Sequence, residues 1–96
     1  MLVEWDPDKA EANLRKHGVS FEQAQELLTS EDDCLEIFDE DNSIDEERFI
    51  SIGVTSAGVL VVVWTERDTD IIRVISARVA TRREEELFWG YIRGER

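Results

Sequence analysis

The pattern of apolar and polar residues divides the first part of the chain into a short strand and a helix. Residues 2–5 form an apolar opening that we expect to be a strand, and Asp6 followed by Pro7 is typical of a helix N-cap and first turn. We predict a helix over residues 7–16, which Gly18 ends. Its inward positions, spaced by three and four residues, are Ala10, Asn13, Leu14 and His17.

A second helix follows at once. Ser20 and Gln23 have the spacing of a capping box, and the helix is expected to end near Thr29. Its inward stripe consists of Phe21, Ala24 and Leu28. Residues 34–38 are predicted to form a short edge strand, and the acidic stretch over residues 39–47 is predicted to be a solvated loop.

The next segments predict a small antiparallel sheet. Residues 48–54 alternate, a turn at residues 56–58 leads into the fully apolar segment 59–64, and a polar loop over residues 66–70 precedes a third strand, residues 71–77. Such short connections join antiparallel neighbours. The first of these strands carries three residues on one face, namely Ile50, Ile52 and Val54.

The chain closes with a helix that begins after Thr81, where Glu84 completes a second capping box. We expect one side of this helix to dock on the sheet through Leu87, Phe88, Tyr91 and Ile92. The whole chain, residues 1–96, is therefore predicted to be one α+β domain. It consists of a small antiparallel sheet of three or four strands, two N-terminal helices and a C-terminal helix.

Charge and cysteine content bear on the possible partners and on the cellular location of the protein. The net charge is −12, and the segment from His17 to Glu47 holds twelve acidic residues and no Lys or Arg. Such a chain binds nucleic acid poorly by overall charge, so any nucleic-acid site must be a local basic one. A single cysteine, Cys34, the lack of a secretion signal and the absence of a membrane-length apolar run lead us to expect a cytoplasmic protein with no membrane partner.

Four arginines near the C-terminus form the best local anion site, and they are Arg73, Arg78, Arg82 and Arg83. Each could equally form a surface ion pair with one of the many carboxylates. Arg73 and Arg78 are an odd number of residues apart, so an ideal strand would place them on opposite faces. We therefore predict that the strand is broken or bulged around residues 76–78.

Other residues are weaker candidates for chemistry. His17 could carry a proton or could be a hydrogen-bonded structural histidine, and the adjacent Lys16 could contact a phosphate or solvate the helix end. Glu47 and Arg48 bring opposite charges to the rim of the sheet. They could belong to a functional site or simply form an ion pair at the end of the strand. Glu84 is explained first by its capping role.

The sequence contains neither a glycine-rich phosphate loop nor the residues of a usual metal site, because one His and one Cys cannot supply the common ligand sets. Magnesium bound by carboxylates alone in the acidic segment is a weak alternative. We expect no cofactor and no metal.

Taken together, these pieces resemble the BrnT toxins over roughly residues 3 to 88. The resemblance rests on a set of short motifs in order, which are Glu4-Trp-Asp6, Lys9, Asn13, Lys16-His-Gly-Val-Ser-Phe21, Glu46-Glu-Arg48, Gly53, Thr65-Glu66, Arg73, Ile75-Ser-Ala-Arg78, Ala80-Thr81 and Glu84. The combination is far more specific than any single motif.

The resemblance implies a RelE-like fold and a ribonuclease activity that arrests translation. It also implies neutralisation by a BrnA-like antitoxin with a ribbon-helix-helix DNA-binding domain, so DNA would be reached only through the antitoxin. The positions that match the family's toxic surface are Lys16, His17, Glu47, Arg48, Arg73 and Arg78, with Glu84 as a further candidate. A metal-free transesterification of RNA follows as a hypothesis.

The last helix departs from the family pattern, which usually has more basic residues and an aromatic hydroxyl there. This chain has Glu85, Glu86 and Phe88 at those positions, and Tyr91 lies one turn later. An alternative reading is therefore a catalytically weakened or inactive protein that keeps the antitoxin-binding surface.

Overall fold

The computed structural model describes residues 1–42 and 46–94 of the chain. Its elements in order are β1 (Leu2–Glu4), α1 (Pro7–His17), α2 (Phe21–Thr29), β2 (Leu35–Phe38), the 3₁₀ helix η1 (Glu40–Asn42), β3 (Phe49–Thr55), β4 (Gly58–Asp68), β5 (Ile71–Val79) and α3 (Arg82–Ile92). The predicted α+β class is confirmed. The acidic stretch predicted as a loop contains η1, and residues 43–45 of that prediction lie outside the described residues.

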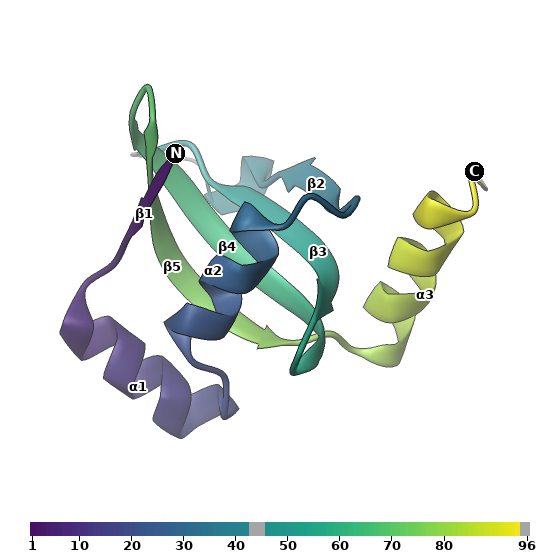
Figure 1. Cartoon of the computed structure of the whole chain (residues 1–96), viewed down its shortest axis with the longest axis horizontal. Helices are drawn as coiled ribbons and strands as arrows, with labels where there is room; N and C mark the ends of the chain where they lie inside the picture. The colour runs from purple at the N-terminus through teal and green to yellow at the C-terminus, as the bar shows by residue number, and fades with distance from the viewer. Residues whose placement is uncertain (43–45, 95–96) are drawn as a thin grey trace.

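The sheet has five strands in the order β1-β5-β4-β3-β2, and it is mixed (Figure 1). The predicted sheet of three or four antiparallel strands is therefore wrong at one edge. β1 runs parallel to β5, with Leu2 opposite Ile71 and Glu4 opposite Arg73. A parallel pairing is made by a long crossover, and no local turn pattern indicates where such a crossover ends.

The hairpin between β4 and β5 is longer than the pattern predicted. Residues 66–70 were expected to be a loop, yet β4 continues to Asp68, which lies opposite Ile71. This end of the hairpin is exposed, so polar side chains are compatible with strand pairing there. Backbone hydrogen bonds thus extend the strands beyond the apolar segments.

Local capping explains where the helices begin. The Asp6 carboxylate accepts a hydrogen bond from the Asp8 N–H at 2.8 Å, and Gly18 ends α1 in a left-handed conformation with φ of 70°. Both predicted capping boxes are confirmed. They join Ser20 with Gln23 at the start of α2 and Thr81 with Glu84 at the start of α3.

Helices α1 and α2 cover one face of the sheet, which we call the helix-covered face (Figure 1). The buried side chains that meet there are Val19, Phe21, Ala24, Leu27, Leu60, Val62, Trp64, Ile72, Val74 and Ala77. One predicted inward position is wrong, because Leu14 is 49% exposed. Leu28 packs against the core as predicted but is only partly buried, and the fully covered leucine of α2 is Leu27.

Asn13 completes the sheet at its open edge. β1 covers only the first part of β5, and the Asn13 side chain takes the place of a neighbouring strand farther along. Its Nδ2 donates to the carbonyls of Ala77 at 2.7 Å and Val19 at 3.0 Å, and its Oδ1 accepts from the Ala77 N–H at 3.1 Å. These bonds satisfy backbone groups that would otherwise be buried without partners.

Of the described α-helices, α3 lies against the opposite face, and it stands at the far side of the sheet from α1 (Figure 1). Phe88 is 2% exposed and packs against Ile52, Val59 and Val61. The other three side chains predicted to dock, Leu87, Tyr91 and Ile92, remain 39% to 55% exposed. That part of the prediction is wrong because, among the described residues, α3 buries one apolar side chain against the sheet rather than a full stripe. None of the described helices has the length and hydropathy to cross a membrane.

Candidate active site

A bulge in β5 decides where its two arginines point. Val63 lies opposite Ser76, but the next residue of β4, Trp64, lies opposite Val74, which leaves Ile75 as an extra residue in β5. The predicted break in the strand is confirmed, one residue before the expected segment. The extra residue reverses the alternation, so that an odd spacing across it joins positions on the same face.

Arg73 and Arg78 consequently share the face opposite α1 and α2. Val74 and Ala77 both lie in the core beneath the two helices, so their neighbours Arg73 and Arg78 face the other way. Arg78 lies opposite Val61, which packs against Phe88 of α3. The two arginines therefore occupy the side of the sheet that α3 leaves partly open.

Arg48 joins them from the neighbouring part of the sheet. It directly precedes β3, and alternation from Ile50, which packs with the Phe88 cluster, places it on the same side. The Thr65 hydroxyl donates to the Glu47 carbonyl at 2.6 Å, and Thr65 lies opposite Arg73 in the sheet. We call this surface, with Arg48, Arg73 and Arg78, the arginine face.

Arg78 is held in a two-pronged ion pair with Glu84 at the start of α3. Its two terminal nitrogens donate to the two Glu84 oxygens at 2.6 and 2.7 Å, and one of these oxygens also accepts from the Thr81 N–H at 2.9 Å. The hydrogen bonds from Arg78 are the main reason that the pKa of Glu84 falls to about 2, and they raise the pKa of Arg78. Glu84 is thus a permanently charged partner of Arg78 and a poor proton carrier.

Arg73 and Arg48 have looser carboxylate partners. The Arg73 Nε lies 3.6 Å from a Glu4 oxygen, and an Arg48 terminal nitrogen lies 3.6 Å from a Glu46 oxygen. Among the described residues, the Arg73 Nε is shielded from solvent and has no acceptor at hydrogen-bond distance. The Arg73 guanidinium, held at this distance from Glu4, is easier to engage with an incoming phosphate than the tightly bound Arg78.

Glu4 is a member of this face that sequence reasoning did not single out as a site residue. Its place beside Arg73 depends on the parallel pairing of β1 with β5. Glu47, which was predicted as a candidate, has an exposed side chain, and the acidic partner of Arg48 is its neighbour Glu46. The signal that could have identified Glu4 was its position at the end of an N-terminal strand.

Lys16 and His17 lie apart from the arginine face. They end α1, whose Ala10 packs into the core of the helix-covered face. Within residues 1–42 and 46–94, neither side chain makes a hydrogen bond or ion pair, and His17 is half-buried. The structure therefore gives neither residue a contact with Arg73 or Arg78.

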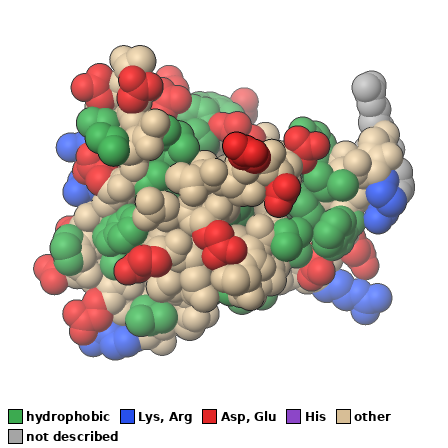
Figure 2. Space-filling model, in the orientation of Figure 1, with side chains coloured by type: hydrophobic (Ala, Val, Ile, Leu, Met, Phe, Trp, Pro, Cys, Tyr) green, Lys and Arg blue, Asp and Glu red, His purple; other side chains and the backbone are tan. Residues whose placement is uncertain are grey.

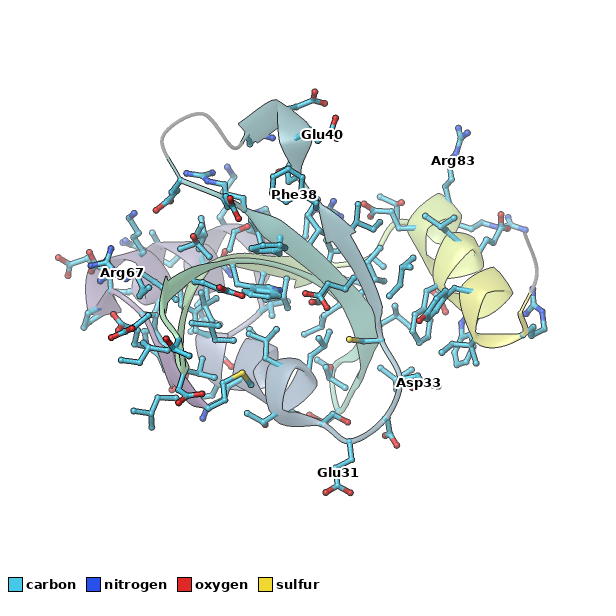
Figure 3. All side chains as sticks on the ribbon, turned by 90° about the horizontal axis from the view of Figure 1, so that it is seen from above. Glu31, Asp33, Phe38, Glu40, Arg67 and Arg83 are labelled. Atoms are coloured by element: carbon cyan, nitrogen blue, oxygen red, sulfur yellow. The ribbon has the colours of Figure 1, made fainter. Side chains whose placement is uncertain are left out.

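The predicted group of four arginines is divided between two elements. Arg82 on α3 pairs with Glu86 at 3.3 Å, with both side chains largely exposed. Arg83 projects from α3 away from the sheet (Figure 3). Of these four, Arg73 and Arg78 belong to the arginine face, and Arg82 and Arg83 do not. In the described part of the chain, no three His, Cys, Asp or Glu side chains are arranged to hold a metal ion.

Comparison with known proteins identifies the family of this chain. The sequence model described as "Ribonuclease toxin, BrnT, of type II toxin-antitoxin system" matches residues 5–84. The chain belongs to the BrnT family. The family is one of ribonuclease toxins of type II toxin–antitoxin systems, which implies an antitoxin partner.

A solved structure has the same fold as this BrnT-family chain. It is the 1.1 Å crystal structure of the Brucella abortus ribonuclease toxin BrnT, which matches with a TM-score of 0.66. The match covers 85% of this chain and 99% of the Brucella chain at 22% sequence identity, so it establishes the fold alone. Among curated proteins, none matches the sequence significantly.

Proposed function

We propose that this chain is an endoribonuclease that cleaves RNA by metal-independent transesterification, with the arginine face as its active surface. The observation that carries the proposal is the bulge at Ile75, which turns Arg73 and Arg78 to the same side of the sheet in a chain of the BrnT family. In a protein of net charge −12, three guanidinium groups on one surface form a local phosphate site.

The proposed reaction is attack of an RNA 2′-hydroxyl on the adjacent phosphorus. A base takes the 2′-hydroxyl proton, the bond from phosphorus to the 5′-oxygen breaks, and the products are a 2′,3′-cyclic phosphate and a 5′-hydroxyl end. Arg73 and Arg78 stabilise the extra charge of the phosphorane, and Arg48 steadies the leaving oxygen as it takes up a proton. Lys16, the other residue predicted for this role, lies apart from the arginine face. Of the predicted bases, Glu47 adjoins this face whereas His17 does not, and we add Glu4 because it lies beside Arg73.

The proposal extends to the cellular role. RNA cleavage would arrest translation in the cytoplasm, and the antitoxin would be a BrnA-like protein with a ribbon-helix-helix domain, through which the pair reaches DNA indirectly. We further propose that the sheet and its helices are related to the RelE fold. The shared α+β class and the arrangement of helices around one small sheet support this relation.

One observation favours the second candidate function, a binding module that retains the antitoxin surface without cleavage. Arg48, Arg73 and Arg78 each lie within 4 Å of a carboxylate, and the pair with Glu84 is tight. A phosphate would have to compete with Glu84 for Arg78. Because Glu84 is already charged, this competition carries an electrostatic cost.

An RNA cleavage assay with matched arginine variants distinguishes the two functions. We expect Arg73→Ala to lower the cleavage rate of the purified chain by about 100-fold, because it removes a group that stabilises transition-state charge. Arg67→Ala is the control, since it removes the same charge from an exposed position on the β4–β5 hairpin (Figure 3). It should change the rate by no more than about twofold.

Glu84→Gln tests the competition at Arg78. If the chain cleaves RNA, releasing Arg78 from its carboxylate should increase cleavage. A folded wild-type chain that neither cleaves RNA nor arrests growth on induction, yet binds its antitoxin, would exclude the enzyme and leave the binding module. Equal rates for the wild type and Arg73→Ala would exclude the proposed role of the arginine face.

A further inference from the structure

A groove separates α3 from the end of the sheet, on the same side of the sheet as the arginine face. It has a volume of about 370 Å³ and is lined by Asp32, Asp33, Val54, Phe88, Trp89 and Ile92. We call it the α3 groove. Its walls come from α3, from the end of β3 and from the segment between α2 and β2.

The α3 groove is apolar and accessible. Phe88 is buried at its base, while Val54, Trp89 and Ile92 are 48%, 38% and 39% exposed. Figure 2 shows hydrophobic side chains gathered over α3, with acidic side chains beside them. A continuous apolar surface with a polar rim is typical of a site that another protein covers.

The rim of the groove is acidic, which favours a partner that carries positive charge. Asp32 and Asp33 line it, and Asp33 points from the α2–β2 segment toward the side of α3 (Figure 3). They belong to the segment from His17 to Glu47, which has no Lys or Arg. Such a rim repels RNA phosphates and attracts a chain with Lys or Arg beside its apolar side chains.

A second copy of this chain fits the groove poorly. Each copy has a net charge of −12, so two copies repel one another, and the same-sign rims would face each other in a symmetric contact. A partner of opposite charge avoids this repulsion. The groove therefore selects a basic segment that carries apolar anchors.

We propose that the α3 groove binds a basic amphipathic segment of the antitoxin, with its apolar side chains against Trp89 and Ile92 and its cations beside Asp32 and Asp33. This inference rests on the proposed function, in which the chain is paired with an antitoxin. It gives the antitoxin and the RNA neighbouring surfaces, with the antitoxin held at the α3 groove and RNA at the arginine face. The family match ends at Glu84, so Trp89 and Ile92 lie beyond the matched segment.

Calorimetry with the full-length chain and its purified antitoxin tests the apolar part. The double variant Trp89→Ala/Ile92→Asp should weaken binding by about 100-fold, because central aromatic anchors dominate binding energy. Both side chains are already partly exposed, so the fold should persist. The matched control is Leu87→Asp, which changes an exposed residue on the opposite side of α3 and should alter affinity by less than about threefold.

Charge reversal tests the rim. Asp32→Lys/Asp33→Lys should weaken antitoxin binding by about tenfold at low salt, and the loss should shrink as salt rises. Glu66→Lys/Asp68→Lys makes the same change in net charge at exposed positions on the β4–β5 hairpin, away from α3 (Figure 1). A similar loss from both pairs would show general attraction rather than a docking site and would overturn the inference.

Two further outcomes would overturn the inference. If the groove variants bind the antitoxin normally and Arg73→Ala binds it weakly, the antitoxin covers the arginine face instead. If the chain alone sediments as a dimer and Trp89→Ala/Ile92→Asp makes it monomeric, a second copy occupies the groove. RNA cleavage is assayed without antitoxin, so loss of the proposed activity and loss of the docking site are distinguished.

Discussion

The two faces of the sheet differ in how they are covered. On the helix-covered face, α1 and α2 seal the strands with side chains such as Phe21, Leu60 and Ala77, all of them fully buried. On the arginine face, α3 makes contact through Phe88, and guanidinium groups remain half-exposed beside it. One face of the same sheet therefore provides the core, and the other provides a charged surface.

The difference shows how the bulge at Ile75 keeps the core residues of β5 on one face and its arginines on the other. The strand β5 contributes Ile72 and Val74 to the core before Ile75 and Ala77 after it. Without the bulge, one of the two arginines would have to point into the core. The bulge lets both halves of the strand keep their apolar side chains inward and both arginines outward.

Ala77→Arg should break this separation and have the largest effect. It would place a guanidinium in a fully buried position beneath α1 and α2, and an uncompensated buried charge is costly. We expect a loss of about 5 kcal/mol or more, close to the whole stability of a small domain. Circular dichroism and urea unfolding would measure it.

Val79→Arg is the control because it introduces the same charge at an exposed position of β5. It should cost about 0.5 kcal/mol or less. An Ala77→Arg variant that unfolds at the wild-type urea concentration would show that β5 can realign and bring the new guanidinium to solvent. The bulge would then not determine which residues of β5 face the core.

Removing one buried phenylalanine from each face compares their contributions to stability. Phe21→Ala should lower the free energy of unfolding by about 3–5 kcal/mol, because Phe21 lies at the centre of the larger core. Phe88→Ala should cost about 2–3 kcal/mol, since α3 can detach while the rest of the sheet stays folded.

Hydrogen exchange separates the two phenylalanine variants further. Phe88→Ala should raise exchange in α3 and leave the amides of β4 and β5 protected, whereas Phe21→Ala should raise exchange throughout the sheet. Equal effects on all elements in both variants would show that α3 unfolds together with the core. The two faces would then be one cooperative unit.

Loss of the ion pair between Arg78 and Glu84 should have the smallest effect on the free energy of unfolding, and that effect should depend on pH. The pKa of Glu84 is lowered from 4.5 to about 2 in the folded chain, so the pair stabilises the fold above pH 4.5. That contribution is lost as the pH falls from 4.5 to 2. Glu84→Gln should cost about 1–2 kcal/mol at pH 7, since both side chains are partly exposed.

The difference in unfolding free energy between wild type and Glu84→Gln should shrink toward zero as the pH falls through that window. Glu86→Gln is the matched control, because its pair with Arg82 is largely exposed. It should cost a few tenths of a kcal/mol and show little pH dependence. A pH-independent cost for Glu84→Gln would exclude the ion pair as its cause.

Much of the fold followed from local patterns. The capping boxes at Ser20 and Thr81 and the stop at Gly18 gave the helix positions to within a residue or two, because caps satisfy the backbone with nearby side chains. The edge strand β2 was also predicted. The apolar stripe of α3 was overestimated, since periodicity indicates which residues could be buried and not how much of a helix reaches its neighbour.

The site was predicted only in part. Odd spacing between Arg73 and Arg78 showed that a shared face required a break, and the structure contains one. Local patterns could not predict that Glu4 lies beside Arg73. Glu84, the carboxylate beside Arg78, was predicted, but as a capping residue. The roles assigned to Lys16, His17 and Glu47 stay predictions.

Sequence alone determined the helix caps, the α+β class and the family motifs, because each depends on residues close together along the chain. Tertiary structure decided that β1 pairs in parallel with β5, that Asn13 closes the open edge at Ala77, and that α3 leaves a groove beside Trp89. These contacts join residues far apart in the chain. They form only when the sheet is assembled, so no local pattern indicates them.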